Sequence, residues 1–250
     1  MSLLEKIQSV HLSQDDISGR HQLIKNQLLE RAASIDGPVF TVIDTDDLSI
    51  LFGLYDQHFF NGTVAEAIGN SLLTFRLSSR MTSAGGKTTC YKLGASRHYE
   101  ISVSTALLFG CFTGDDHRPI SCSGIVCVDR VDALMRIMEH ELVHLIEMQL
   151  WNDSSCKKKR FHSITLRFFG HTENVHSMIT PRERAIEKFG IQGGSKVAFQ
   201  YEGQLLSGIV NRVTKRATVL VESADGQLYS DGNRYKKYYV PLSALRKVDS

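Results

Sequence analysis

The residues of this chain best suited to chemistry are His140, Glu141 and His144, which stand in the order His-Glu-Leu-Val-His. Two imidazoles four residues apart lie one turn apart on the same face of a helix, where both can bind one divalent cation. Zinc held in this way lowers the pKa of a bound water, and a neighbouring carboxylate can take the proton. We therefore expect zinc-dependent hydrolysis, with His140 and His144 as metal ligands, Glu141 as the catalytic base and Zn²⁺ as the cofactor.

The motif must lie on a helix for its two imidazoles to converge. Between Asp129 and Trp151 apolar residues recur at three- and four-residue spacing, and Asp129 is a suitable N-cap. The apolar members are Val131, Leu134, Met135, Met138, Leu142, Leu145, Ile146 and Leu150. The spacing predicts a helix over residues 129–151 that carries the motif.

A catalytic zinc ion usually takes a third protein ligand and leaves its fourth position to water. The extended metzincin pattern is excluded, because it needs Gly at position 147 and His at position 150, where this chain has Glu and Leu. Residues 161–169 predict a short second helix closed by Gly170, which returns antiparallel to the first. We favour His162, because it lies in the first turn of that helix. The nearby candidates are His162, His171, Glu173 and His176.

Five separate blocks of the sequence resemble the SprT-like (Spartan-type) zinc metalloprotease domain, and their order and spacing fit that family over residues 46–180. The blocks are Leu54–Gly62, Arg80–Gly86, Tyr99–Ser104, His140–His144 and Phe161–Thr172. The resemblance implies zinc ligands at His140, His144 and His162, with Glu141 as the base. It also implies a zincin-like fold and proteolysis of proteins on DNA, including those covalently trapped there. Protein substrates and DNA are therefore the expected partners.

We expect an α+β protein of three parts. Residues 1–45 predict a helical N-terminal leader. Residues 46–190 correspond to the SprT-like domain, in which helices pack on a small sheet; within that sheet Gly85-Gly86 would permit a tight turn. Residues 191–250 contain short strands separated by Glu-Gly and Asp-Gly turns, and they predict a small all-β barrel. This last part is similar to an SH3-like fold of the KOW or Tudor type.

The charge balance limits where nucleic acid would bind. The chain has 29 Lys and Arg against 27 Asp and Glu, a net charge of +2, which is far from the strongly basic balance of a dedicated nucleic-acid domain. Any DNA contact must then be local. Candidate phosphate contacts are Lys157, Lys158, Lys159 and Arg160, just before His162, although a solvated loop between two helices is the alternative. Basic residues and tyrosines also alternate in the C-terminal barrel.

The remaining composition is that of an intracellular globular protein, cytoplasmic or nuclear. Five cysteines, at positions 90, 111, 122, 127 and 156, are odd in number and lack paired spacing, which is typical of reduced thiols. No run of eighteen apolar residues occurs, so we expect no membrane segment. The alternative to an enzyme is a non-catalytic, zinc-stabilised module that binds nucleic acid or protein. Glu141 favours the enzyme, since a structural zinc site needs no base.

Overall fold

The computed structural model describes residues 1–94, 96–214 and 216–248, and it confirms a mixed α+β protein. The chain divides into two compact units, Met1–Met178 and Ile179–Ser250. The last two residues of the predicted barrel, 249 and 250, lie outside the described residues. Among the described helices, none combines the length and the hydrophobicity that crossing a bilayer requires.

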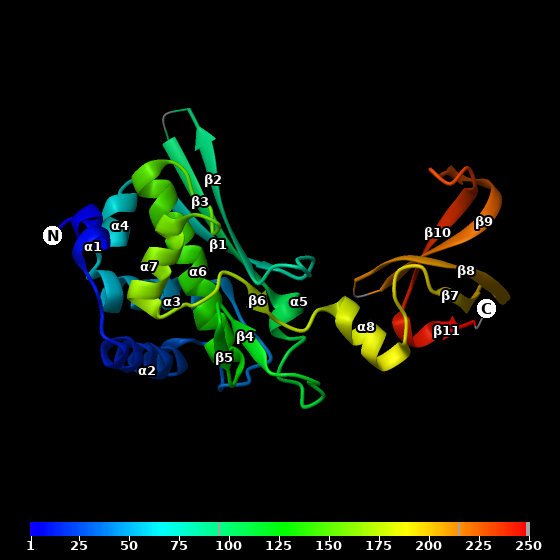
Figure 1. The fold of residues 1–250 in the computed structure, drawn as a ribbon, viewed down its shortest axis with the longest axis horizontal. Coiled ribbons are helices and arrows are strands. Elements are labelled where there is room, and N and C mark those ends of the chain that lie inside the picture. Colours follow the sequence, from blue (N-terminus) through cyan, green and yellow to red (C-terminus); the bar gives the residue numbers. More distant parts are fainter. Residues whose placement is uncertain (95, 215, 249–250) are drawn as a thin grey trace. The chain divides into compact units, whose positions relative to one another are not determined.

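The first unit is built around one long helix, α6 (Arg130–Trp151), which contacts most other elements of the unit (Figure 1). Its neighbours include several helices and the strands β2 (Gly86–Leu93) and β3 (Ser96–Ser104). The other helices are α1 (Leu3–Ser9), α2 (Gln14–Arg31), α3 (Thr45–Tyr55), the π-helical turn η1 (Asp56–Phe60), α4 (Thr63–Ile68), α5 (Thr105–Leu108) and α7 (Lys159–Phe169).

The sequence prediction for α6 is confirmed within one residue. Asp129 is the N-cap, and its side chain accepts a hydrogen bond from the backbone N–H of Asp132 at 2.8 Å. The Nζ of Lys25 lies 2.6 Å from a carboxylate oxygen of each of these two aspartates, which ties α2 to the start of α6. The helix ends where Asn152 adopts a left-handed conformation at φ 55°.

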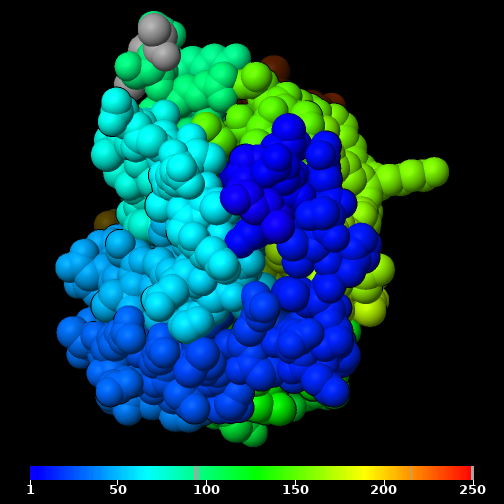
Figure 2. Space-filling view, turned by 90° about the vertical axis from the view of Figure 1, so that its left-hand side faces the viewer, coloured from blue at the N-terminus to red at the C-terminus, as the bar shows by residue number. Residues whose placement is uncertain are grey.

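The predicted leader is part of the first unit. Lys6 donates to the carbonyl of Phe60 at 2.9 Å, and Arg20 donates to the carbonyl of His58 at 2.6 Å. Both carbonyls belong to η1, so the N-terminal helices bind the irregular turn that follows α3. Figure 2 shows residues of α1 and α2 on one face together with those of α3 and α4. Residues 1–45 are therefore structural members of this unit.

A three-stranded sheet lies beside α6. Its order is β1-β3-β2, with β1 and β3 parallel and β2 and β3 antiparallel. Gly85 and Gly86 form no tight turn: Gly86 opens β2, and the carbonyl of Gly85 accepts from the N–H of Ser104 at 2.8 Å. A second small sheet has the order β5-β4-β6. The strands are β1 (Leu72–Ser78), β2 (Gly86–Leu93), β3 (Ser96–Ser104), β4 (Ile120–Cys122), β5 (Ile125–Cys127) and β6 (His176–Ser177).

The second unit contains a five-stranded antiparallel sheet of order β10-β9-β8-β7-β11 and the α-helix α8 (Pro181–Phe189). The predicted alternation in this region is confirmed as strands, whereas the SH3-like topology stays a prediction. The domain border falls at residue 178 rather than 190, because Ala185 of α8 is buried in the same core as Val197 and Val219. The other elements are β7 (Lys196–Tyr201), β8 (Gln204–Val213), β9 (Ala217–Leu228), β10 (Arg234–Val240), η2 (Leu242–Ala244) and β11 (Arg246–Lys247).

Candidate metal centre

The two imidazoles of the motif face each other across one turn of α6. The Nε2 atoms of His140 and His144 lie 3.2 Å apart. Two nitrogens bound at about 2.0–2.1 Å to one tetrahedral ion would be separated by roughly 3.3–3.4 Å. The two nitrogens are therefore close enough together to bind one cation.

The tautomer of His144 follows from its second nitrogen. Nδ1 lies 2.6 Å from the hydroxyl of Ser154, and that hydroxyl donates its single hydrogen to Glu147 at 2.7 Å. Ser154 must therefore accept from Nδ1–H, which leaves the lone pair of His144 on Nε2, facing His140. Glu147 is fully buried and also accepts from Nε of Arg160 at 2.6 Å. A chain of hydrogen bonds thus orients the second imidazole.

His140 is kept neutral by its surroundings. Burial, together with the neighbouring His176 and His144, lowers its pKa to about 2. Burial also lowers the pKa of His144. The ring of Phe161 packs against both imidazoles, with centroids 4.8 and 4.6 Å away. Nδ1 of His140 is buried without a hydrogen-bond partner. Neutral, desolvated imidazoles with free lone pairs have the donor chemistry that zinc requires.

Glu141 lies beside the imidazoles and is held by strand β2. The hydroxyl of Thr88 contacts both the carboxylate and the carbonyl of Glu141, at 2.8 and 2.9 Å. Burial raises the pKa of Glu141 to about 7, against the opposing effect of the Thr88 hydrogen bonds. A Cβ on Gly86 would lie 2.7 Å from Cγ and Oε1 of Glu141, so a side chain at this position would displace the carboxylate from where it lies.

The motif opens onto a groove of about 420 Å³. Its lining comes from residues 83–88 at the start of β2, from α6, from the loop after α6 and from residues 174–176. A second cavity of about 300 Å³ shares Lys87, Thr88, Met148 and Ser154 with the first, and it continues along β2. The site therefore lies in a groove that follows a strand at the edge of its sheet.

The structure does not bring His162 to the motif histidines. Its side chain is exposed, and no set of metal-ligating atoms within 4.8 Å includes it among the described residues. The reason is the apolar face of α7, on which Phe161, Ile164 and Phe168 are buried. His162 directly follows Phe161 in the helix and therefore faces solvent. The aromatic neighbour, Phe161, takes the place against the imidazoles.

Two other residues bring donor atoms to the motif. The ligand atoms of Cys156 lie within 4.8 Å of those of both His140 and His144. Those of His176 lie within the same distance of His140 and Glu141, and both ring nitrogens of His176 are buried without partners. The chain thus offers a sulfur and an imidazole beside the two motif nitrogens.

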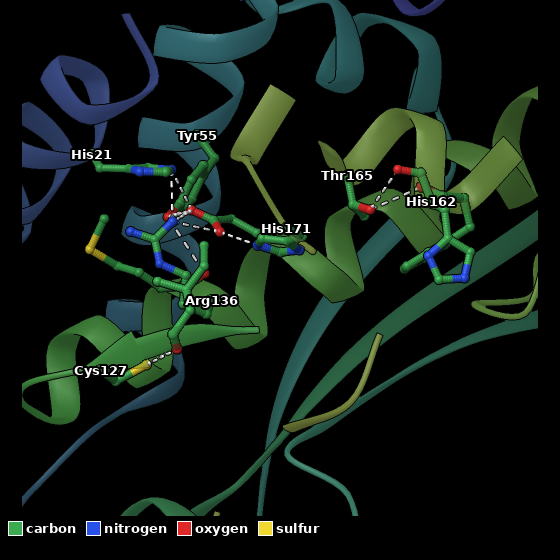
Figure 3. A network of polar contacts seen from close by, with 11 residues as sticks. His21, Tyr55, Cys127, Arg136, His162, Thr165 and His171 are labelled. Atoms are coloured by element: carbon green, nitrogen blue, oxygen red, sulfur yellow. Dashed lines mark hydrogen bonds and ion pairs between the residues drawn. The ribbon is translucent and has the colours of Figure 1, made fainter. Parts of the chain in front are cut away.

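His171 has a different role from the one considered in the sequence. Its Nε2 lies 2.6 Å from the buried carboxylate of Glu139, which also accepts from Tyr55 at 2.6 Å and from Arg136 at 2.7 Å (Figure 3). Nε2 of His21 lies 2.8 Å from Oε1 of the same carboxylate. Burial alone would raise the pKa of Glu139, but Arg136, His21 and His171 hold it well below its usual range. This network joins α2, α3 and α6 to the loop after α7.

The remaining candidate third ligand, Glu173, is exposed.

The four predicted phosphate contacts are not equivalent. Arg160 binds Glu147 and stacks over Trp151 at 4.2 Å, and Lys158 forms an ion pair with Asp153. Lys157 and Lys159 are exposed. Half of the basic run is therefore engaged in holding the loop after α6.

The sequence reasoning did not find Thr88, Ser154, Cys156 or the close approach of Gly86. Thr88 and Gly86 come from a strand and lie 52 and 54 residues before His140, the first residue of the motif, so no local pattern connects them to it. A signal did exist for Cys156, since it stands between the motif and the second helix, where the chain passes back beside the site.

Comparison with protein-family models, with curated proteins and with solved structures finds no match for this chain. Its function must therefore be inferred from the residues and the geometry of this groove.

Proposed function

We propose that this protein is a zinc-dependent endopeptidase with His140 and His144 as two metal ligands and Glu141 as the base. The observation that carries the proposal is the pair of Nε2 atoms 3.2 Å apart, beside a buried carboxylate in an open groove. A structural zinc site would have no use for that carboxylate. His162 as a further ligand is supported by the SprT-like resemblance and not by the position of its side chain.

When bound, zinc would polarise the peptide carbonyl and lower the pKa of a water molecule. Glu141 would take a proton from the attacking water and pass it to the leaving amine. A carboxyl group whose pKa lies near 7 is suited to both steps, because it exchanges protons readily at neutral pH. Thr88 holds the carboxylate, and the Ser154–Glu147 pair holds the imidazole of His144. The groove orients the peptide beside them.

An extended peptide is the substrate form that the groove fits. β2 is an edge strand of its sheet, and the backbone of such a strand can pair with a peptide lying along it. This kind of recognition depends only weakly on side chains. The resemblance to SprT-like proteases supports substrates bound or crosslinked to DNA. Lys157 and Lys159, exposed next to the groove's loop, are the residues we expect to contact phosphate.

The decisive experiment compares wild-type protein with Glu141→Gln. We expect the variant to keep its zinc but to lose cleavage of a DNA-bound protein by at least about 10²-fold, since general base catalysis contributes roughly 10²–10⁴. Glu173→Gln, an exposed glutamate near the groove, is the matched control and should cleave normally. Each protein is assayed with and without DNA. Wild-type protein that binds zinc yet cleaves nothing would instead support the non-catalytic binding module.

A further inference from the structure

Cys156 brings a sulfur atom to the same point as the two motif imidazoles. The ligand atoms of His140, His144 and Cys156 all lie within 4.8 Å of one another. Among the described residues, no other His, Cys, Asp or Glu completes such a set with both histidines, since the second set contains His140, Glu141 and His176 without His144. A donor atom close to both nitrogens is what a third ligand of one ion requires.

The loop that carries Cys156 is held at that residue and at the residue before it. Before it, the N–H of Ser155 donates to the buried carboxylate of Glu147 at 3.3 Å. At Cys156 itself, the carbonyl accepts from the side-chain amide of Asn174 at 2.7 Å. The backbone that carries the sulfur therefore has a defined path.

Thiolate sulfur is one of the ligands that zinc prefers, at about 2.3 Å, and it combines with imidazole in many protein sites. Binding would replace the S–H bond by a sulfur–metal bond and release the proton to solvent, with no change of oxidation state. Cys90 offers a comparison, because it is also half-buried and lines the adjoining cavity but belongs to no set of ligand atoms.

We propose that Cys156 is a ligand of the same ion that His140 and His144 hold, so that the site is of the His₂Cys type. This rests on the proposed function only in requiring that ion, and not in requiring proteolysis. A consequence is that the metal and thiol-modifying reagents compete for one sulfur.

Cobalt(II) added to the intact metal-free chain tests the proposal directly. Coordination of a thiolate gives an intense near-ultraviolet charge-transfer band in addition to the weak visible bands of the ion. We expect that band in wild type and in Cys90→Ser, and its loss in Cys156→Ser. The Kd for zinc should also rise by about 10-fold or more in Cys156→Ser, since loss of a group that only hydrogen-bonds a metal ligand already costs roughly 10–100-fold in metal affinity.

A second measurement needs no variant. Iodoacetamide should alkylate Cys156 in the metal-free protein and spare it when zinc is bound, whereas modification of Cys90 should not depend on zinc. Visible cobalt bands without the charge-transfer band, or alkylation of Cys156 at an equal rate with and without zinc, would overturn the proposal. Neither result would contradict the proposed protease function if Glu141→Gln still abolishes cleavage. If the thiolate band appears but the protein cleaves no substrate, the proposed function is wrong and the assignment of Cys156 as a ligand stands.

Discussion

At the scale of single residues, the motif supplies the donors and other segments fix their orientation. The lone pair of His144 faces His140 because Ser154 receives the hydrogen of Nδ1. Glu141 is held by a hydroxyl from β2. Neither partner is part of the motif, yet each determines whether the donor can act. Support of this kind commonly contributes 10–100-fold to metal affinity or activity.

Thr88→Val should lower kcat by about 10–100-fold, because the carboxylate of Glu141 loses the hydroxyl that fixes it. Zinc content and KM should change little, since the hydroxyl of Thr88 hydrogen-bonds Glu141 rather than an imidazole. Steady-state kinetics and metal analysis measure the effect. Thr88→Ser keeps the hydroxyl and should restore kcat, while the neighbouring Thr89→Val should behave as wild type. An unchanged kcat in Thr88→Val would mean that Glu141 is positioned without it.

At the scale of elements, α6 is both the scaffold of the site and the centre of the first unit. Its buried Glu139 binds side chains from α2, α3 and the loop after α7, and Gly86 lets β2 approach Glu141. The same helix bears both the core contacts and the two motif histidines. A substitution at the end of α6, far from those histidines, should therefore lower the stability of the unit more than it lowers activity.

Asp129→Ala should destabilise the first unit by about 1–2 kcal/mol, as expected for the loss of an N-cap at the start of a buried helix. The variant also loses the contact with Lys25. In a domain of this size each kcal/mol lowers Tm by roughly 2–4 °C, which thermal unfolding can measure. Asp46→Ala, on an exposed position in the first turn of α3, is the control. Equal Tm values for the two variants would contradict the role of this cap.

At the scale of the whole molecule, the two units have separate cores. The first is organised by α6 and the second by the β7–β11 sheet with Ala185 of α8. The candidate ligands all lie in the first unit. A bound ion should therefore stabilise that unit and leave the other unaffected.

Calorimetry with and without a chelator should show this. We expect removal of zinc to lower the Tm of only one unfolding transition, the one whose Tm is also lowered by Asp129→Ala. At a free zinc concentration of 100 Kd, binding contributes about 2.7 kcal/mol to the bound unit. The transition assigned to the second unit should keep its Tm, and it provides an internal control. A chelator that shifts both transitions equally, or neither, would show that the ion is not confined to the first unit.

Much of the fold was accessible from local patterns. Periodicity and Asp129 predict α6, Gly170 marks the end of α7, and alternation predicts the strands of the second unit. Helix caps and side-chain periods act over a few residues, so a sequence displays them directly. His140, Glu141 and His144 were identified for the same reason, because four-residue spacing on a helix is a local property.

The third donor could not be decided in this way. The same periodicity that forms α7 buries Phe161, and the next residue, His162, must then face solvent. Cys156 and Thr88 reach the site through a loop and a distant strand, whose positions depend on packing across the unit. The sequence by itself determined the helix and the two imidazoles that lie on it. Only the tertiary structure decided which sulfur and which hydroxyl groups surround them, because those neighbours meet through long-range packing rather than through spacing along the chain.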